Sequence, residues 1–331
     1  MPKLKLVVCL DWTPNTNHAG FYVAAADGLY AKAGLDVELR SPDADPAQKL
    51  TPARQVAAGQ AQFAVTPSES AISFSTTDHE VPKLRAVAAL VQGDTSAICT
   101  LTSSGIDRPA KLAGKRYASY DGRFEDPIVA QMVRNDGGDG DAVQFHSLDA
   151  HAYADAATMG AGSVVASYLE TGKSDATWIF PAWEGVLAAR AGQSLNLFTL
   201  GDHGIPYGYS PILLAHPSML DGDAAAHTRA FLAATAAGYA KAAADPKAAA
   251  AALCACGHPS LADRAFVTAS AEAIAPKYLT ADGAWGRMEL GRWSAFVDFL
   301  SASSILVDRE KAPIPREKVD AAALFTNELL P

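Results

Sequence analysis

The chain has 331 residues, of which 49% are hydrophobic and 19% charged, with a formal net charge of -9 and a sequence pI near 5.3. This composition is typical of a folded protein and excludes a disordered or fibrous one, and the acidic balance argues against a nucleic-acid partner. No apolar stretch approaches the roughly 18 residues that a membrane-spanning helix needs, whereas the length favours two hydrophobic cores.

The N-terminal apolar run, Lys5 to Leu10, is too short for the hydrophobic region of a signal peptide, and we predict a buried strand there. Two locations therefore stay open. The protein is cytoplasmic if Met1 is the native start, and periplasmic or at the cell surface if a leader has been removed. The cysteines stand apart in apolar or alanine-rich surroundings, which predicts free thiols and no disulfide framework. They are Cys9, Cys99, Cys254 and Cys256.

Strand and helix signals alternate from the start of the chain. Strands are predicted over 4–10, 35–40 and 61–66, and helices over 18–34, 51–59 and from Ser68 through the seventies. Thr51 and Pro52 are typical of an N-cap and a first helical position, and Gly34 of a helix end. This order predicts parallel strands joined by right-handed crossovers.

Two further strands are predicted over 84–90 and 97–104, and the second ends where the chain could leave the first lobe. A second α/β series follows, with predicted strands over 115–119, 142–147, 175–180, 196–200 and 210–216 and predicted helices over 125–136, 163–172 and 182–192. The last of these strands is a candidate return crossing. The remainder is alanine-rich and helical, with predicted helices over 222–244, 245–253 and 288–303.

Two strands are candidates for crossings between lobes, near Cys99–Ser103 and Ser210–Ala215. We therefore predict an α/β protein with one lobe formed by residues 1–100 plus 213–331 and the other by 101–212. Two α/β lobes with two hinge crossings and a returning helical tail resemble the type II periplasmic-binding-protein fold. In such open sheets a ligand lies beyond the carboxyl ends of the strands.

The loop after the first predicted strand offers the most informative set of side chains. Trp12 provides an aromatic face, Asn15 and Asn17 provide carboxamides, and His18 provides an imidazole. Such groups suit a heterocycle that needs both stacking and hydrogen bonds. The alternative is a turn in which asparagine and proline only shape the backbone.

Polar and aromatic residues recur at the other predicted strand ends, and we predict that they bind the same ligand. They are Ser68, Glu69, Thr95, Ser96, Tyr120, Asp121, Glu125, Trp178, Phe180, Trp183, Glu184, Tyr207 and Tyr209. Any one of them could instead serve packing, and Ser68 and Ser119 could be simple helix caps. Their recurrence at one edge of each sheet favours a binding site.

Several stretches together resemble the thiamine-pyrimidine family of binding-protein-like proteins. They read LDWTPNTNHAGFYVAAADGLYAKAGLDVEL, QGDTSAI, DATWIFPAWEG and YGYSPILLAH. That family contains receptors for formylaminopyrimidine and fungal synthases of the thiamine pyrimidine. The resemblance implies a receptor for an aminopyrimidine or a similar flat polar heterocycle, which closes by hinge motion and has an ABC transporter as a possible partner.

The synthase branch uses a lysine that holds pyridoxal phosphate, a substrate histidine and an iron-binding cysteine run. The corresponding stretches here read VTPSES at 65–70 and IPYGYSP at 205–211 and contain none of these residues. A Schiff base needs an amine, so the resemblance implies the receptor branch without a cofactor. A divergent synthase, or a hydrolase using Glu69 or Asp121 with His18, stays as the alternative.

Two further stretches could bind metal ions. Cys254, Cys256 and His258 lack a familiar zinc spacing, and Asn135–Asp141 lacks the spacing of an EF-hand loop. We therefore expect a helix end and a solvated turn at these places, and no metal site.

Overall fold

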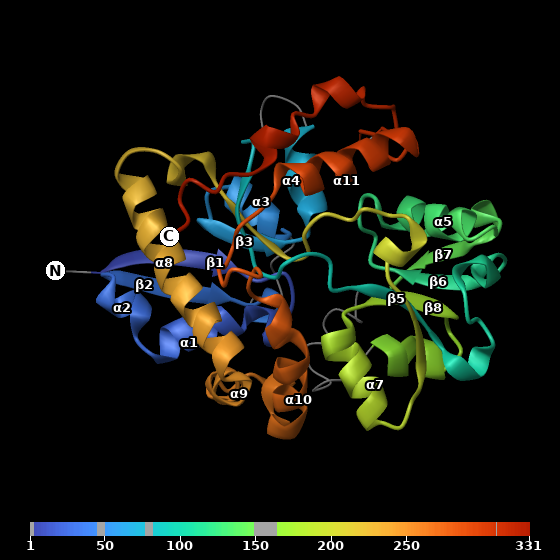
Figure 1. The fold of residues 1–331 in the computed structure, drawn as a ribbon, viewed down its shortest axis with the longest axis horizontal. Coiled ribbons are helices and arrows are strands. Elements are labelled where there is room, and N and C mark those ends of the chain that lie inside the picture. The colour runs from blue at the N-terminus through green and yellow to red at the C-terminus, as the bar shows by residue number, and fades with distance from the viewer. Residues whose placement is uncertain (1–2, 45–49, 77–81, 149–163, 309) are drawn as a thin grey trace. The chain divides into compact units, whose positions relative to one another are not determined.

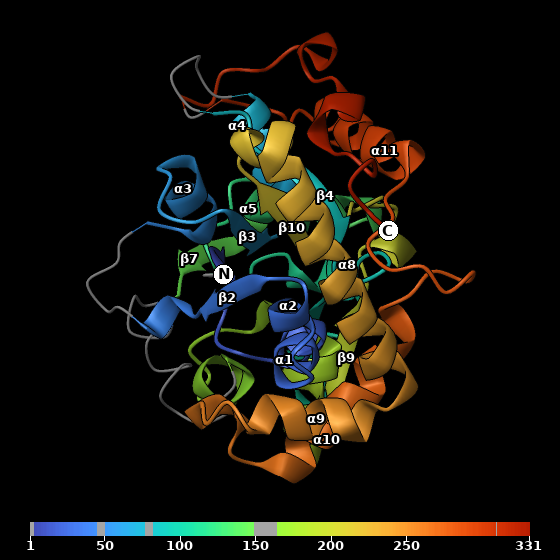
Figure 2. The same ribbon diagram turned by 90° about the vertical axis from the view of Figure 1, so that its left-hand side faces the viewer.

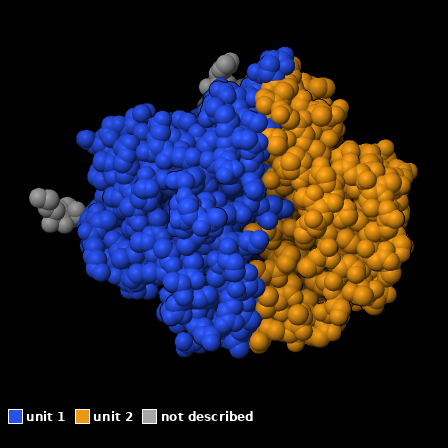
Figure 3. All heavy atoms as spheres, in the orientation of Figure 1, with its two compact units in different colours: residues 1–94, 208–294, 317–331 blue, residues 95–207, 295–316 orange. Residues whose placement is uncertain are grey.

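The computed structural model describes residues 3–44, 50–76, 82–148, 164–308 and 310–331. The chain forms two compact units, which Figure 3 colours separately. Unit 1 comprises Met1–Asp94, Gly208–Ser294 and Glu317–Pro331, and unit 2 comprises Thr95–Tyr207 and Ala295–Arg316.

These bounds differ from the predicted lobes in the helical tail, which was expected to return entirely to the first lobe. The segment Ala295–Arg316 belongs to unit 2. There the Phe296 ring lies 4.8 Å from that of Tyr207, and the Arg123 guanidinium donates a hydrogen bond to the Val307 carbonyl. Alanine-rich composition predicts a helix but does not identify the surface against which the helix packs.

Unit 1 contains a five-stranded sheet in the order β2-β1-β3-β10-β4 (Figure 1). The strands are β1 (Leu4–Cys9), β2 (Leu35–Arg40), β3 (Phe63–Thr66), β4 (Arg85–Ala89) and β10 (Ile212–Ala215). β1 pairs in parallel with β2 and β3, as predicted, and β10 runs antiparallel between β3 and β4. The carboxyl ends of β1 and β3 therefore meet at one edge of the sheet.

Helices cover this sheet. They are α1 (Ala19–Ala26), α2 (Leu29–Lys32), α3 (Pro52–Ala57), α4 (Ser68–Ser75), α8 (Gly222–Ala244), α9 (Pro246–Cys254) and α10 (Arg264–Ile274). The predicted helix 18–34 is divided at Gly28, whose φ of 67° is left-handed and ends α1 before α2 begins. Figures 1 and 2 both show α1 beside α8. At this crossing a Cβ atom on Gly238 would lie 2.1 Å from the Gly20 carbonyl oxygen, so only glycine permits the approach.

Unit 2 contains the second sheet, in the order β7-β6-β8-β5-β9. Its strands are β5 (Ala97–Leu101), β6 (Arg116–Ser119), β7 (Gln144–Ser147), β8 (Ala176–Ile179) and β9 (Leu195–Phe198). β6 pairs in parallel with β7 and β8, and β5 is antiparallel to β8 and β9.

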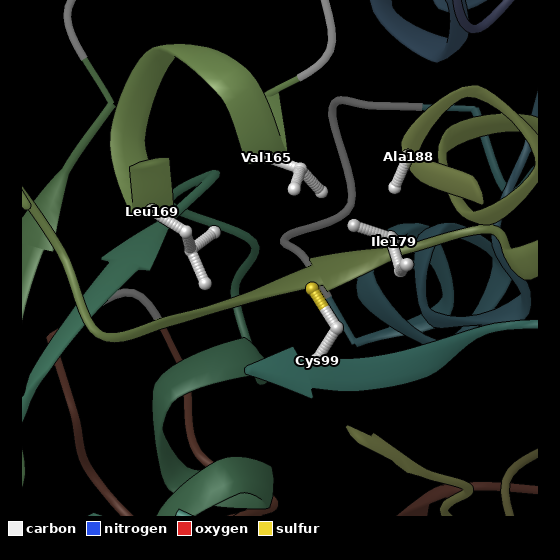
Figure 4. Packing of buried hydrophobic residues seen from close by; sticks show 5 residues of the cluster. All are labelled: Cys99, Val165, Leu169, Ile179 and Ala188. Carbon is white, nitrogen blue, oxygen red and sulfur yellow. The ribbon is translucent and has the colours of Figure 1, made fainter. Parts of the chain in front are cut away.

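The helices of unit 2 include two π-helical segments, η6 (Val165–Glu170) and η7 (Pro181–Gly185), besides α5 (Glu125–Asn135) and α7 (Val186–Arg190). Helix α11 (Leu290–Ala302) begins in unit 1 and ends in unit 2. A hydrophobic cluster joins β5, β8, η6 and α7 (Figure 4). Its buried members are Cys99, Val165, Leu169, Ile179 and Ala188.

Two expectations about the whole chain can be compared with the described residues. None of their helices combines the length and the apolarity needed to cross a bilayer. All four cysteines are free thiols, as predicted.

Candidate functional site

The loop after β1 is ordered by its own side chains. The Asn15 Oδ1 atom accepts a hydrogen bond from the Asn17 backbone N–H at 2.9 Å, and Asn15 Nδ2 donates to the Thr13 carbonyl at 3.0 Å. Asn15 is the N-cap of the short helical turn Thr16–His18. Its carboxamide is thus used within the loop, where it shapes the backbone, and its contact with a ligand stays a prediction.

His18 has a similar internal role. It is fully buried, its Nδ1 atom accepts from the Asn15 backbone N–H at 3.3 Å, and its Nε2 atom lies 2.8 Å from the Asp11 carboxylate. Because Nδ1 accepts, the neutral ring carries its proton on Nε2 and donates it to Asp11. Both ring nitrogens are engaged within the loop, and a contact of His18 with a ligand stays a prediction.

Hydroxyl groups from the C-terminal helices of unit 1 hold this loop from outside, which the sequence analysis missed. Three of them donate to consecutive parts of its backbone: Tyr239 to the Asn17 carbonyl at 2.7 Å, Tyr278 to the Thr16 carbonyl at 2.6 Å and Ser260 to the Pro14 carbonyl at 2.9 Å. Thr16 and Ser270 also share a hydrogen bond of 2.7 Å. The loop therefore presents the half-buried Trp12 and the Asn17 side chain from a rigid base.

The turn from β3 to α4 contains two buried hydroxyls without a hydrogen-bond partner in the described structure. Thr66 is 4% exposed and Ser68 is fully buried, and neither Oγ1 of Thr66 nor Oγ of Ser68 is paired. The N-cap of α4 is Pro67, so the alternative that Ser68 is the cap is wrong. An unpaired buried hydroxyl costs about 1–3 kcal/mol, and such groups in a folded protein need an explanation. Glu69, 8% exposed, follows in the same turn.

Tyr209 lies beside this turn but is engaged in packing. It is 2% exposed, and its carbonyl accepts the Ser68 backbone N–H at 3.0 Å. Its hydroxyl accepts from the Glu289 backbone N–H at 2.9 Å, and the Arg292 guanidinium lies 5.0 Å from its ring centre. The carbonyl and the hydroxyl of Tyr209 are thus both hydrogen-bonded within unit 1, and its contact with a ligand stays a prediction.

In unit 2, the loop between β6 and α5 is filled by its own carboxylates. Glu125 accepts hydrogen bonds from the backbone N–H groups of Tyr120 and Gly122 and from the Tyr117 hydroxyl, at 3.0–3.2 Å. Glu125 thus holds the loop, and its contact with a ligand stays a prediction. Tyr120 is half-buried and Asp121 is exposed, so these two predicted site residues lie at the surface of the loop.

The same loop contains a second acidic contact. The Ser119 hydroxyl donates to the Asp126 carboxylate at 2.6 Å and accepts from the Asp121 backbone N–H at 3.0 Å. Burial raises the pKa of Asp126, the Ser119 hydrogen bond opposes this, and the nearby Asp121 raises it further. Added negative charge is therefore unfavourable at the start of α5.

The end of β8 and the segment after it contain several aromatic residues and one carboxyl group. The Trp178 ring lies 5.5 Å from that of Tyr207, and Phe180 donates its backbone N–H to Glu184 Oε2 at 2.9 Å. Trp183 is 7% exposed, whereas Trp178, Phe180 and Glu184 are half-buried. Burial raises the pKa of Glu184 to about 7, although the N–H groups of Phe180 and Glu184 itself partly oppose the shift. The π-turn at Pro181–Gly185 produces this geometry, and such turns are frequent at functional sites.

Residues 15–249 match the profile of the family described as NMT1/THI5 like. The chain belongs to that family. The formylaminopyrimidine-binding protein of Halalkalibacterium halodurans is 25% identical over 214 residues, which cover 65% of this chain and 59% of that protein. A Haemophilus influenzae protein whose name refers to thiamine biosynthesis is 30% identical over 135 residues, 41% of each chain. The matches thus span only part of these relatives.

Solved structures confirm the predicted two-lobed periplasmic-binding-protein fold for this NMT1/THI5-like chain. A protein from Bordetella bronchiseptica RB50 superposes with a TM-score of 0.70 at 19% identity, covering 99% of this chain and 96% of that one. The alkanesulfonate-binding protein from Xanthomonas axonopodis pv. citri, bound to MOPS, gives 0.65 at 14% identity, covering 98% and 99%. At these identities the likeness concerns the fold alone.

Two candidate sites of the NMT1/THI5-like chain remain: the predicted ligand-binding pair Thr95 and Ser96, and the possible metal-binding stretch at Cys254–His258. Thr95 precedes β5 with a buried, unpaired Oγ1 atom, and Ser96 beside it is 3% exposed. The stretch with Cys254, Cys256 and His258 does not assemble a metal site within the described residues, where no three candidate ligands cluster. His258 instead lies 2.8 Å from the Asp43 carboxylate.

Proposed function

We propose that this protein is a binding protein for a thiamine-type aminopyrimidine. The observation that carries the proposal is the half-buried carboxyl group of Glu184, which accepts the Phe180 backbone N–H in the turn after β8 and has its pKa raised to about 7. An aminopyrimidine offers a ring nitrogen beside an exocyclic amine, and a carboxyl group can pair with both. Near neutral pH Glu184 can act as donor or acceptor, and it stabilises the protonated ring when it is ionised.

The charge of the candidate site supports a neutral or cationic ligand over an anion. In unit 2 the backbone N–H groups of Tyr120 and Gly122, which could bind an anion, already donate to Glu125. In unit 1 the Glu69 carboxyl lies in the first turn of α4. The sulfonate ligand of the structural neighbour would therefore meet negative charge at both places, while an amine would be attracted.

Within this proposal, Trp12 stacks on the ring, and Asn17, Glu69 and Glu184 meet its polar edge. Tyr120 and Asp121 add contacts when the two units close on the ligand. Because such contacts exist only in a closed state, they would shift the population toward it. Small-angle scattering with and without ligand tests the closure, and an unchanged radius of gyration would contradict it.

The remaining parts of the proposal concern partners and location. We infer an ABC importer as partner, because ABC substrate-binding proteins share this fold, among them a ligand-binding component of an import system from Staphylococcus aureus. Such a partner requires a location outside the cytoplasmic membrane, whereas a cytoplasmic location would exclude it. Cell fractionation with an antibody against the protein distinguishes the two.

Calorimetric titration with a formylaminomethyl-substituted 4-aminopyrimidine tests the ligand class, with ethanesulfonate as the competing class. We expect binding of the pyrimidine only, weakened roughly tenfold to a hundredfold by Trp12→Ala or Glu184→Gln. Glu170→Gln is the matched control, because Glu170 is exposed at the end of the other π-helical segment of unit 2. Binding of the sulfonate alone, or equal affinity in all variants, would refute the proposal.

A further inference from the structure

Two buried hydroxyls without a hydrogen-bond partner, those of Thr66 and Ser68, flank Pro67 in the turn from β3 to α4. Thr66 is the last residue of β3 and Ser68 the first of α4, and both side chains are more than nine-tenths buried. Other buried hydroxyls of unit 1 do have partners: Thr228 donates to the Met219 carbonyl at 2.7 Å, and Thr235 to the Phe231 carbonyl at 2.8 Å. Within the described residues, the one other buried hydroxyl without a partner is that of Thr95, which precedes β5 in unit 2.

The backbone of the turn explains why these hydroxyls are not used internally. The residue between them is Pro67, which is the N-cap of α4 and has no side-chain group to cap the helix. The Ser68 backbone N–H donates to Tyr209, and that of Ser70 donates to the Pro67 carbonyl. These two backbone N–H groups are thus paired without the hydroxyls, which lie beside the N-terminal turn of an eight-residue helix.

The turn from β3 to α4 lies at the same edge of the unit 1 sheet as the Trp12 loop. β3 pairs in parallel with β1, and Thr66 ends β3 at the edge where the Trp12 loop follows β1. Open α/β sheets bind ligands beyond the carboxyl ends of adjacent parallel strands. A ring stacked on Trp12 would extend its substituents along this edge.

We propose that the Thr66 and Ser68 hydroxyls form a subsite for a small, neutral, oxygen-bearing substituent of the ligand, such as a formamide or a hydroxymethyl group. The hydroxyls can donate to a carbonyl oxygen or accept an N–H, and the positive end of α4 favours an acceptor there. The Glu69 carboxyl in the same turn disfavours a phosphate or sulfonate. This inference rests on the proposed function and assigns one substituent of its ligand.

The test combines two variants with two probes. The variants are Thr66→Val and Ser68→Ala, which remove only the hydroxyls. The probes are a 4-aminopyrimidine with a formylaminomethyl group at C5 and the same ring with only a methyl group there. We expect each variant to bind the first probe roughly threefold to tenfold more weakly and the second with unchanged affinity. The melting temperature should be unchanged or higher, because no internal hydrogen bond is lost.

Thr235→Val is the matched control, because its buried hydroxyl is paired with Tyr30 and with the Phe231 carbonyl. It should lower the melting temperature and leave both affinities unchanged. Unchanged binding of the first probe by Thr66→Val and Ser68→Ala, or equal losses for both probes, would overturn the subsite. If the unaltered protein binds neither probe, the proposed function itself fails, which is a separate outcome.

Discussion

Removal of the Tyr239 hydroxyl should loosen the Trp12 loop without disturbing the core around it. The Tyr239→Phe change keeps a ring that stacks on Trp285 at 4.9 Å and meets the edge of Phe21 at 5.8 Å. It removes only the hydrogen bond to the Asn17 carbonyl, 222 residues away in the sequence. Tyr278→Phe removes the equivalent bond to the Thr16 carbonyl. Both changes act on the loop that presents Trp12.

The expected size of the effect follows from what each carbonyl loses. A buried acceptor that loses its donor costs about 1–3 kcal/mol in the free energy of unfolding. Tyr30→Phe is the control, because Tyr30 is also buried and shares a 2.9 Å hydrogen bond with Thr235, whose hydroxyl keeps its bond to the Phe231 carbonyl. That change should cost about 0.5–1.5 kcal/mol and should not reach the loop.

Hydrogen exchange of the loop amides separates a local effect from a general loss of stability. We expect faster exchange over residues 10–20 in Tyr239→Phe and Tyr278→Phe, together with roughly threefold to tenfold weaker pyrimidine binding. Tyr30→Phe should change neither. If all three variants lose stability equally and retain the exchange rates and affinity of the unaltered protein, the tyrosines are ordinary core residues and the reasoning is wrong.

Three further outcomes are expected. Burial raises the pKa of Glu184 to about 7 from 4.5, so the folded protein retains a proton that the unfolded chain releases, and stability should fall as pH rises through this window. Glu184→Gln should flatten that decline, by at most about 3 kcal/mol, in denaturant titrations from pH 4 to 8. Gly238→Ala should destabilise by about 1–3 kcal/mol or prevent folding, because its Cβ would lie 2.1 Å from the Gly20 carbonyl, whereas Gly291→Ala, with open space, should be tolerated in thermal melts. The absorbance spectrum of the purified protein should contain no band of a lysine–pyridoxal phosphate aldimine that borohydride treatment would remove, because residues 65–70 contain no lysine.

The sequence predicted most of the regular elements because their signals are local. Apolar runs marked all ten strands of the described residues, and Thr51 with Pro52 marked the start of α3. The break at Gly28 was missed because the apolar pattern continues through it, whereas only a left-handed φ ends the helix. Helix α10 was not assigned separately within the alanine-rich tail, although Asp263 caps it by accepting from the Phe266 backbone N–H.

The candidate site was predicted less completely, because residue type does not reveal which partner a side chain takes. Asn15, His18 and Glu125 stand at strand ends as predicted, but their polar atoms bond within their own loops. The anchoring hydroxyls of Tyr239 and Tyr278 were missed, since only the fold brings them to a loop more than 200 residues earlier. A pairing of Asn15 with His18 three residues later is a capping-box spacing, and that signal could have been used.

The charge at the start of α5 leads to a last prediction about the class of ligand. A shared fold fixes the edge at which ligands bind, but the loops at that edge decide the charge that is accepted. In this chain the N–H groups at the start of α5 are already bonded to Glu125, and Asp126 lies beside it with its pKa raised by burial. An anion there would have to displace a carboxylate and face another. Glu125→Gln would keep an oxygen acceptor for the loop while removing one charge. We therefore expect it to weaken the binding of a protonated pyrimidine at low ionic strength. This effect should disappear at high salt. A salt-independent loss would mean that Glu125 acts through loop geometry and not through charge.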